Sequence, residues 1–374
     1  MQFIDLKSQF NAVKEDIQNR IDTVLQHGQF IMGPEVKALE QQLGDYTGAK
    51  HAISCSSGTD AILLALMAYG IGPGDAIFTT PFTFIATAEV ISLLGATPIF
   101  VDIDTQSYNI DPVKLASAIE NFQHPHLKPK GIIAVDLFGL PADYAAINEL
   151  AKAHDLFVIE DGAQSFGATY HGSKACALAD IGCTSFFPAK PLGCFGDGGM
   201  CFTNNDELAH IMRSLRVHGA GVHKYDNERI GINGRLDTLQ AAILLSKFTL
   251  FPQEVEKRNI AASRYNELLS TGSANLTLPH FFDDITSVWA QYSILAENTD
   301  HRAHIQTALK EEGVPSAIYY PRPLHLQKAF APLGYKKGDF PMSEACSDRI
   351  FSLPMHPYLD MDDQKKIAGI INRL

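Results

Sequence analysis

The chain has 374 residues, of which 46% are hydrophobic and 19% charged, and its formal net charge at pH 7 is −12. This length can bury a sizeable core and form two domains, whereas the acidic balance argues against nucleic acid or an acidic membrane surface as a partner. The N-terminus lacks the apolar segment of a signal peptide and no apolar run is long enough to span a bilayer, so we expect a cytoplasmic protein.

The six cysteines lack the paired spacing of metal ligands, and several lie in apolar or glycine-rich runs. Such a distribution is typical of buried thiols in a reducing compartment. We therefore expect no metal site.

The first 70 residues contain three helical patterns. Residues 9–26 carry apolar side chains at helical spacing, and a second helix starts at Pro34, a residue favoured in a first helical turn. The third pattern, Ala61–Ala68, is apolar nearly all round and ends near Gly70. A helix without a polar face is buried, so this third helix belongs to the core.

Apolar segments then alternate with helical patterns as far as residue 203. The predicted helices include Val113–Asn121 and Tyr144–His154, and the predicted strands are Ala76–Thr80, Pro98–Asp102, Gly131–Phe138, Leu156–Asp161, Gly182–Phe187 and Met200–Thr203. Strands that are apolar along their whole length and alternate with helices predict a mostly parallel sheet covered on both faces. Ligands of such α/β folds bind outside the carboxyl ends of the strands.

The pattern changes near Thr249. From there on, a few short strand candidates lie between helical segments. The helical segments are Glu254–Leu269, Ala303–Glu312 and Met361–Leu374. We expect a large domain over residues 1–250, including the N-terminal helical segment, and a smaller α+β domain over residues 251–374.

The segment from Ser185 to Gly199 holds one lysine, Lys190, between Pro188 and Pro191, and four glycines follow within nine residues. Prolines fix the backbone and glycines let the main chain approach a bound group. Apolar surroundings lower the pKa of a lysine, and the neutral amine is the form that attacks an aldehyde and can later move a proton. Lys190 is therefore the first candidate for a catalytic residue.

The apolar strand pattern that begins at Leu156 ends in Asp161, which either caps a helix or pairs with a cation. A protonated pyridine nitrogen is such a cation, and a lysine able to form a Schiff base together with this aspartate is what pyridoxal 5′-phosphate (PLP) requires. Gln164, three residues later, is either a surface side chain or a contact of the cofactor ring.

Other residues could complete a cofactor site. Gly58 and Thr59 lie at the start of the buried helix, whose N-terminus attracts an anion such as phosphate, and Ser185 could add its hydroxyl. Phe84 could stack on the pyridine ring or belong to the core. Arg235 offers a planar fork suited to phosphate or carboxylate, in a segment whose plain interpretation is a loop and helix cap.

His218 is either a structural residue or one at the edge of the site. Its neighbours Arg216, Val217 and Gly219 do not by themselves indicate a chemical role.

Four motifs together resemble the DegT/DnrJ/EryC1/StrS sugar aminotransferases, in order and spacing, from near residue 1 to near residue 360. They are Ser57–Ala61, Glu160–Gln164, Ser185–Lys190 and Asn233–Asp237. The resemblance implies the aspartate aminotransferase fold (PLP fold type I) and a homodimer with sites at the subunit interface. Gly234 departs from the pattern, because related enzymes often have a serine or another small polar residue there.

The same resemblance implies a role for each matching residue. Lys190 would bind the cofactor aldehyde covalently, Asp161 would contact the pyridine nitrogen and Gln164 would lie by the ring. Ser185 with the Gly58–Thr59 turn would hold the phosphate. Across the interface, Asn233 would reach the phosphate and Arg235 the substrate in the neighbouring subunit.

Finer resemblances concern the substrate. Phe187 stands where enzymes that aminate C-4 often carry histidine or asparagine, and the Gly196–Gly199 run looks like the C-3 group. The Ser352–Asp360 stretch is similar to aminotransferases that act on UDP-2-acetamido-2-deoxy-3-oxo-D-glucuronate in O-antigen synthesis. Tyr319, which we place with Tyr320 among the substrate-binding residues, departs from those enzymes, which typically have histidine there.

We therefore expect a transfer of the amino group from L-glutamate to a keto group, C-3 favoured, of a nucleotide-linked sugar. A C-4 aminotransferase or one acting on a dTDP-3-keto-6-deoxyhexose would use the same catalytic residues, and a non-catalytic PLP-binding regulator is an alternative of another class. Lys190 argues against a sugar dehydratase of this fold, which typically has histidine there. A NAD-dependent dehydrogenase is disfavoured because no GxGxxG motif follows an early strand.

Overall fold

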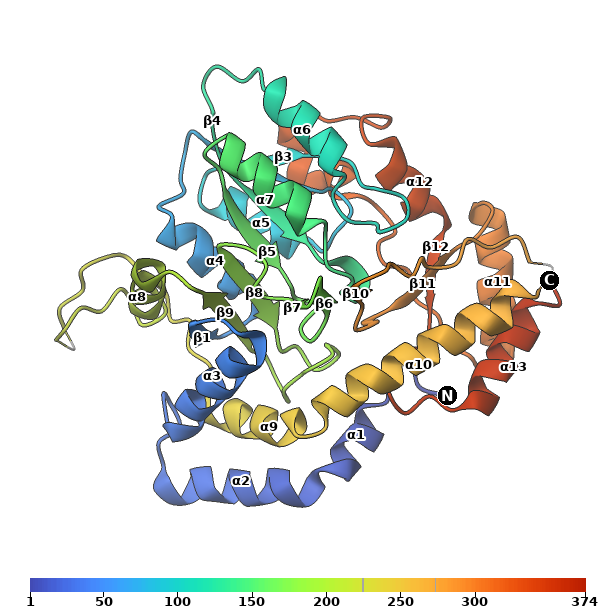
Figure 1. The fold of residues 1–374 in the computed structure, drawn as a ribbon, viewed down its shortest axis with the longest axis horizontal. Helices are drawn as coiled ribbons and strands as arrows, with labels where there is room; N and C mark the ends of the chain where they lie inside the picture. Colours follow the sequence, from blue (N-terminus) through green and yellow to red (C-terminus); the bar gives the residue numbers. More distant parts are fainter. Residues whose placement is uncertain (224, 273) are drawn as a thin grey trace.

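A seven-stranded sheet forms the centre of the computed structural model, which describes residues 1–223, 225–272 and 274–374 (Figure 1). Its strands, in spatial order, are β1 (His51–Cys55), β9 (Gly199–Thr203), β8 (Ile181–Ser185), β5 (Phe157–Asp161), β4 (Lys128–Val135), β2 (Asp75–Thr79) and β3 (Thr97–Phe100). The five strands from β8 to β3 pair in parallel, and β9 runs antiparallel to both of its neighbours. The predicted mostly parallel sheet is confirmed.

Helices cover both faces of this sheet. The helices are α1 (Leu6–Ala12), α2 (Lys14–His27), α3 (Pro34–Thr47), α4 (Gly58–Ala68), α5 (Ala86–Leu93), α6 (Pro112–Glu120), α7 (Tyr144–Ala153), α8 (Asp206–Leu215), α9 (Thr238–Phe248), α10 (Phe251–Ser270), α11 (Thr299–Glu311), α12 (Pro341–Arg349) and α13 (Met361–Ile371). Side chains of α4, α5 and α8 share one core cluster with the sheet, while α6 and α7 cover the opposite face near β3 and β4. Helices α3 and α9 cover the end of the sheet near β1 and β9.

Strand β4 shows how the apolar sequence produces this layering. Ile133 packs in the cluster with α4, whereas its neighbours Ile132 and Ala134 pack in the cluster with α6 and α7. Successive side chains of a strand point to opposite faces, so the buried part of β4, residues 131–135, is apolar at every position, whereas Lys128 and Lys130 at its start are exposed.

The predicted helix over residues 9–26 is wrong in one respect, because the structure divides it at Val13. Val13 has φ −127° and ψ 18°, and it ends α1 and precedes α2. Val13 and Ile17 both pack against Ile243 of α9. Apolar spacing alone did not reveal the break because both pieces contribute side chains to the same cluster.

A second core lies in the C-terminal part. It includes residues of α10, α11 and α13 and of a two-stranded antiparallel sheet, β11 (Tyr292–Leu295) and β12 (Ile350–Leu353). A small sheet of β10 (Ile285–Thr286), β6 (Thr169–Tyr170) and β7 (Ser173–Lys174) joins segments from both parts of the chain. Helix α10 begins with Phe251 in the α3–α9 cluster and continues with Ala261–Leu269 in the second core. The domain boundary near residue 250 stays a prediction.

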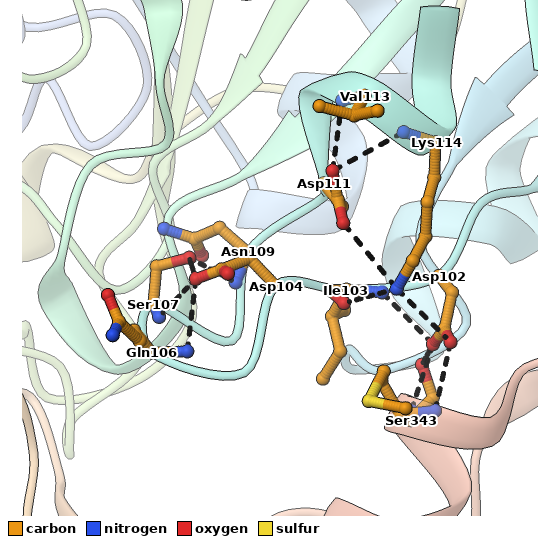
Figure 2. A network of polar contacts seen from close by, with 11 residues as sticks. Asp102, Ile103, Asp104, Gln106, Ser107, Asn109, Asp111, Val113, Lys114 and Ser343 are labelled. Carbon is orange, nitrogen blue, oxygen red and sulfur yellow. Dashed lines mark hydrogen bonds and ion pairs between the residues drawn. The ribbon is translucent and has the colours of Figure 1, made fainter. Parts of the chain in front are cut away.

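Asp102 joins the central sheet region to the C-terminal part (Figure 2). It lies just after β3, and its carboxylate accepts hydrogen bonds from the backbone N–H of Ser343 (2.9 Å) and from the Ser343 hydroxyl (2.6 Å) at the start of α12. Lys114 Nζ lies 3.6 Å from the same carboxylate. Burial by itself raises the pKa of Asp102, but the hydrogen bonds from Ser343 and Met342 outweigh it and hold the pKa below its ordinary value.

Candidate active site

A cavity of about 590 Å³ lies at the carboxyl ends of β5 and β8, where the parallel sheet is expected to bind ligands. All of the predicted site residues line it except Asn233 and Arg235, and Phe187 and Asp197 line it as well. Its walls come from the sheet region and from the C-terminal part, which contributes Tyr319, Tyr320 and Gln291. The fold thus brings together residues that are far apart in the sequence.

Lys190 lies in the loop between β8 and β9. Its backbone N–H donates to the carbonyl of Phe187 over 2.8 Å, which closes a tight turn. Lys247 of α9 donates to the carbonyl of Gly193, so this helix holds the segment that follows the catalytic candidate. Burial lowers the pKa of Lys190, and the nearby charge of Asp161 opposes this only in part. No residue in the described ranges accepts a hydrogen bond from its side-chain amine.

Asp161 is buried at the end of β5. The hydroxyl of Thr87 donates to Oδ2 over 2.7 Å, and the N–H of Ala163 donates to Oδ1 over 3.3 Å. Burial raises the pKa of Asp161, while these hydrogen bonds and the charge of Lys190 act in the opposite direction. The segment that follows forms turns and not a helix, so Asp161 does not act as a helix cap.

Gln164 is buried beside Asp161, which contradicts the interpretation as a surface side chain. Its Oε1 accepts from the N–H of Phe138 over 2.8 Å, and its Nε2 donates to the hydroxyl of Tyr320 over 3.2 Å. These two bonds fix the plane of the amide at the wall of the cavity. Because no helix starts at Asp161, Gln164 reaches this place through a turn and not through helical spacing.

The N-terminus of α4 faces the cavity through Gly58 and Thr59. Ser57 caps this helix by accepting from the N–H of Asp60 over 3.0 Å. A Cβ added to Gly58 would lie 2.6 Å from Cβ of Ser185, so only glycine allows this close approach of strand and helix. Backbone N–H groups of the first helical turn beside the Ser185 hydroxyl form a site suited to a phosphate.

Phe84 is 55% exposed and lines the cavity, which contradicts its interpretation as a core aromatic. Its ring centre lies 6.4 Å from that of Tyr320. The aromatic wall therefore combines one side chain from the sheet region with one from the C-terminal part.

Asn233 and Arg235 lie outside the cavity of their own chain. Asn233 is exposed and its backbone pairs with Val217, whereas Nε of Arg235 is buried and takes part in no hydrogen bond with the described residues. The carbonyl of Gly234 accepts from the N–H of Ser56 over 3.2 Å, which anchors this segment near the start of α4.

His218 does not line the cavity either. Its backbone N–H donates to the carbonyl of Ile232 over 2.9 Å, as expected for a structural residue.

The sequence did not reveal several residues that complete the site. Thr87 bonds to Asp161, and Ile4 and Gln291 line the cavity from segments near the N-terminus and before β11. Asp136 and Glu160 form a buried acidic pair next to Asp161, and burial raises the pKa of Asp136 to about 6 and that of Glu160 well above its ordinary value. Of these residues, only Glu160 belongs to a motif that the sequence analysis identified. The other residues reach the site through contacts between segments that are distant in the sequence.

The described residues contain no cluster of three or more His, Cys, Asp or Glu side chains that could hold a metal ion. Among the same residues, every helix is too short or too polar to cross a bilayer.

Comparison with known proteins gives close matches over the whole length. The profile of the DegT/DnrJ/EryC1/StrS aminotransferase family matches residues 11–372. A UDP-2-acetamido-2-deoxy-3-oxo-D-glucuronate aminotransferase of Pseudomonas aeruginosa is 46% identical over 371 residues, which cover 99% of either chain. A pleiotropic regulatory protein of Geobacillus stearothermophilus is 44% identical over 98% of this chain and 96% of its own.

A solved structure agrees equally well. The crystal structure of a DegT DnrJ EryC1 StrS aminotransferase from Brucella abortus is 48% identical and superposes with a TM-score of 0.94. The match covers 99% of this chain and 98% of that chain.

Proposed function

Because this chain belongs to the DegT/DnrJ/EryC1/StrS family of PLP-dependent aminotransferases, we propose that the cavity around Lys190 and Asp161 is its cofactor and substrate site. The chain has the predicted aminotransferase fold and acts on a nucleotide-linked keto sugar. The observation that carries the proposal is the joint placement of a half-buried lysine of lowered pKa, a buried carboxylate and a helix N-terminus around one cavity.

The residues present fit the cofactor. The cradle between Gly58 and Ser185, which a Cβ would fill, suits the phosphate, and buried Asp161 suits a protonated pyridine nitrogen. Lys190 supplies an amine whose lowered pKa favours the form that reacts with an aldehyde. When bound, PLP supplies an electron sink for the charge that develops on a substrate carbon.

The side chains around the cavity then perform three tasks. Lys190 takes a proton from Cα of the amino donor, which we propose is L-glutamate, and in the second half-reaction delivers a proton to the sugar carbon. Asp161 keeps its negative charge close to the cofactor, and Thr87 holds that carboxylate in place. Gln164 and Tyr320, bonded to each other, keep the wall rigid so that the reacting groups stay aligned.

For the acceptor we propose the C-3 keto group of a UDP-2-acetamido-2-deoxy-3-oxo-hexuronate. The relative in P. aeruginosa is named for such a substrate, and the resemblance of Ser352–Asp360 points the same way. Tyr319 lines the cavity at the position where that group of enzymes typically has histidine, so a related dTDP-linked or C-4 keto sugar is the alternative. The product would serve surface polysaccharide synthesis, such as that of O-antigen, in the cytoplasm.

We also propose that the enzyme is a homodimer in which a second copy completes each site. Phe30, Ile31 and Met32 are exposed apolar side chains, and the carbonyl of Phe30 accepts from the N–H of Thr238 in the segment just after Arg235. Burying these side chains against a second copy would remove apolar surface from water. It would also bring Asn233 and Arg235, which lie outside their own cavity, to a neighbouring one.

A regulatory role without catalysis is the second candidate, favoured by the relative in G. stearothermophilus that is named a regulatory protein. One experiment separates the two. The purified protein, loaded with PLP, is mixed with L-glutamate, and conversion of the cofactor to its amine form is followed by absorbance. Conversion, with formation of 2-oxoglutarate, supports the aminotransferase, whereas unchanged absorbance at high glutamate concentration would refute the proposed glutamate-dependent function and favour the regulatory role.

The acceptor is identified in the reverse direction. UDP- and dTDP-linked amino sugars are supplied with 2-oxoglutarate, and glutamate formation is measured for each of them. We expect the 3-amino uronate to react fastest. A faster reaction with a 4-amino sugar would overturn the C-3 assignment.

A further inference from the structure

Gln291 lines the cavity from the C-terminal part, immediately before β11. Its backbone N–H donates to the carbonyl of Phe138 over 3.5 Å, and the N–H of Phe138 in turn donates to Gln164. Phe138 therefore connects Gln291 to the wall beside Asp161. Gln291 also lines a small adjoining cavity of about 30 Å³.

The side-chain amide of Gln291 has no protein partner within the described residues. Its Oε1 is buried without a hydrogen bond, and none of those residues accepts a hydrogen bond from its Nε2. Gln164, the other glutamine of the cavity wall, differs because both ends of its amide are bonded. A polar group that is withdrawn from water and left unpaired is costly, so an unpaired amide at a ligand cavity points to a partner supplied by the ligand.

The chemistry of the amide restricts that partner. An amide both donates and accepts hydrogen bonds and carries no net charge, so it matches a hydroxyl or an acetamido group. An amide does not compensate the negative charge of the carboxylates of an amino donor such as glutamate. A carboxylate removed from water requires a cation or several hydrogen-bond donors. The small adjoining cavity has room for about one water molecule, which could bond to the amide as well.

We infer that Gln291 is a specificity residue that binds a hydroxyl or acetamido group of the sugar and takes no part in binding the amino donor. This inference rests on the proposed function, since it assigns one wall of the same cavity to the sugar. We therefore expect loss of the amide to weaken the half-reaction with the sugar and to leave the half-reaction with the amino donor unchanged.

The test uses Gln291→Leu, which removes the hydrogen-bonding groups at similar size. Gln106→Leu is the matched control, because Gln106 lines the small cavity and not the large one. Each PLP-loaded variant is mixed in single turnover with L-glutamate and, separately, with a UDP-linked 3-amino sugar that reacts with the wild-type enzyme. The concentration of half-maximal rate is measured for both.

In Gln291→Leu we expect the half-maximal sugar concentration to rise about tenfold, the effect of losing one buried hydrogen bond. The glutamate reaction should stay within about twofold of wild type, which also shows that the variant is folded, and Gln106→Leu should match wild type in both reactions. Equal losses in both half-reactions, or none in either, would overturn the inference. A wild-type protein that fails to react with glutamate would instead refute the proposed function.

Discussion

The hydroxyl of Thr87 donates a hydrogen bond of 2.7 Å to Oδ2 of Asp161, the buried carboxylate at the end of β5. Thr87 lies in the first turn of α5, and the two residues are 74 positions apart in the sequence. Burial raises the pKa of Asp161, and the Thr87 hydroxyl is the strongest of the contacts that lower it. The ionised state of Asp161, on which the proposed mechanism depends, is thus supported from a neighbouring helix.

Replacing Thr87 with valine removes this hydroxyl and keeps the shape of the side chain. The pKa of Asp161 should then rise further, so a smaller fraction is ionised at mildly acidic pH. We expect activity at pH 7 to fall about tenfold and the acidic limb of the pH–kcat/KM profile to move to higher pH.

Thr79→Val is the matched control for this change. Thr79 is also a buried threonine, but its hydroxyl bonds to the carbonyl of Ile133 and not to a carboxylate. A Thr79→Val profile that moves as far as that of Thr87→Val would show that the effect does not pass through Asp161.

Lys190, which lines the cavity, and the buried Lys247 both have a lowered pKa, and they allow a selective test of the covalent role. Burial lowers the pKa of Lys247 to about 8, yet its amine is already bonded to the carbonyl of Gly193. We expect borohydride reduction of the PLP-loaded enzyme to attach the cofactor to Lys190 alone, as read by peptide mass mapping.

Lys190→Ala should accordingly lose turnover by about a thousandfold or more, because both the covalent link and the proton transfer disappear. Lys247→Met should keep the cofactor adduct at residue 190. Recovery of the adduct at Lys247 in the wild-type enzyme would contradict the proposed role of Lys190.

Much of the site could be predicted because several of its residues stand in distinctive local sequence patterns. Lys190 stands between prolines in a glycine-rich loop, and Gly58 and Thr59 lie at the start of a helix that is apolar nearly all round. Asp161 ends an apolar strand. These patterns combine an unusual side chain with a backbone signal, and the structure places all four residues at one cavity.

The remaining parts depend on contacts between distant segments. Neither the neighbours of Thr87 nor those of Gln291 distinguish them from ordinary threonines and glutamines, and only the packing of α5 and of the segment before β11 brings them to the cavity. The break at Val13 was missed for a similar reason, since apolar spacing continues through it and contact with α9 decides the local backbone.

The buried pair of Asp136 and Glu160 predicts an unusual dependence of stability on pH. A pKa of about 6 for Asp136 in the folded chain, against an ordinary value of 3.8, means that the folded state holds a proton that the unfolded chain releases. The retained proton on Asp136 stabilises the folded state at low pH, and this stabilisation is lost as the pH rises from about 4 to 6.

Asp136→Asn should remove the part of this fall in stability with rising pH that comes from Asp136. Measured by denaturant unfolding at fixed PLP concentration, the free energy of unfolding of the variant relative to wild type should increase as the pH rises from 4 to 7. The exposed Asp283→Asn serves as control and should show no such change. A constant difference between Asp136→Asn and wild type across this range would contradict the raised pKa.

Gly58 offers the sharpest test of the phosphate cradle, because the atoms nearest to the Cβ of an alanine at this position would all belong to Ser185. A Cβ at Gly58 would lie 2.6 Å from Cβ of Ser185, and Gly58 lies in the first turn of α4, where alanine is conformationally acceptable. Gly58→Ala should therefore push the strand and the helix apart at the phosphate site. We expect PLP to bind at least about tenfold more weakly, measured by titration of the apoenzyme.

Gly44→Ala in α3 provides the matched comparison, since the nearest atom to its new Cβ would be the carbonyl oxygen of Ala49 at 3.4 Å. That variant should bind PLP like wild type and gain slightly in stability, because alanine favours a helix over glycine. If Gly58→Ala bound PLP as tightly as Gly44→Ala, the phosphate could not lie between the start of α4 and Ser185. The cofactor would then have to occupy another part of the cavity, and the proposed pairing of its ring with Asp161 would fail with it.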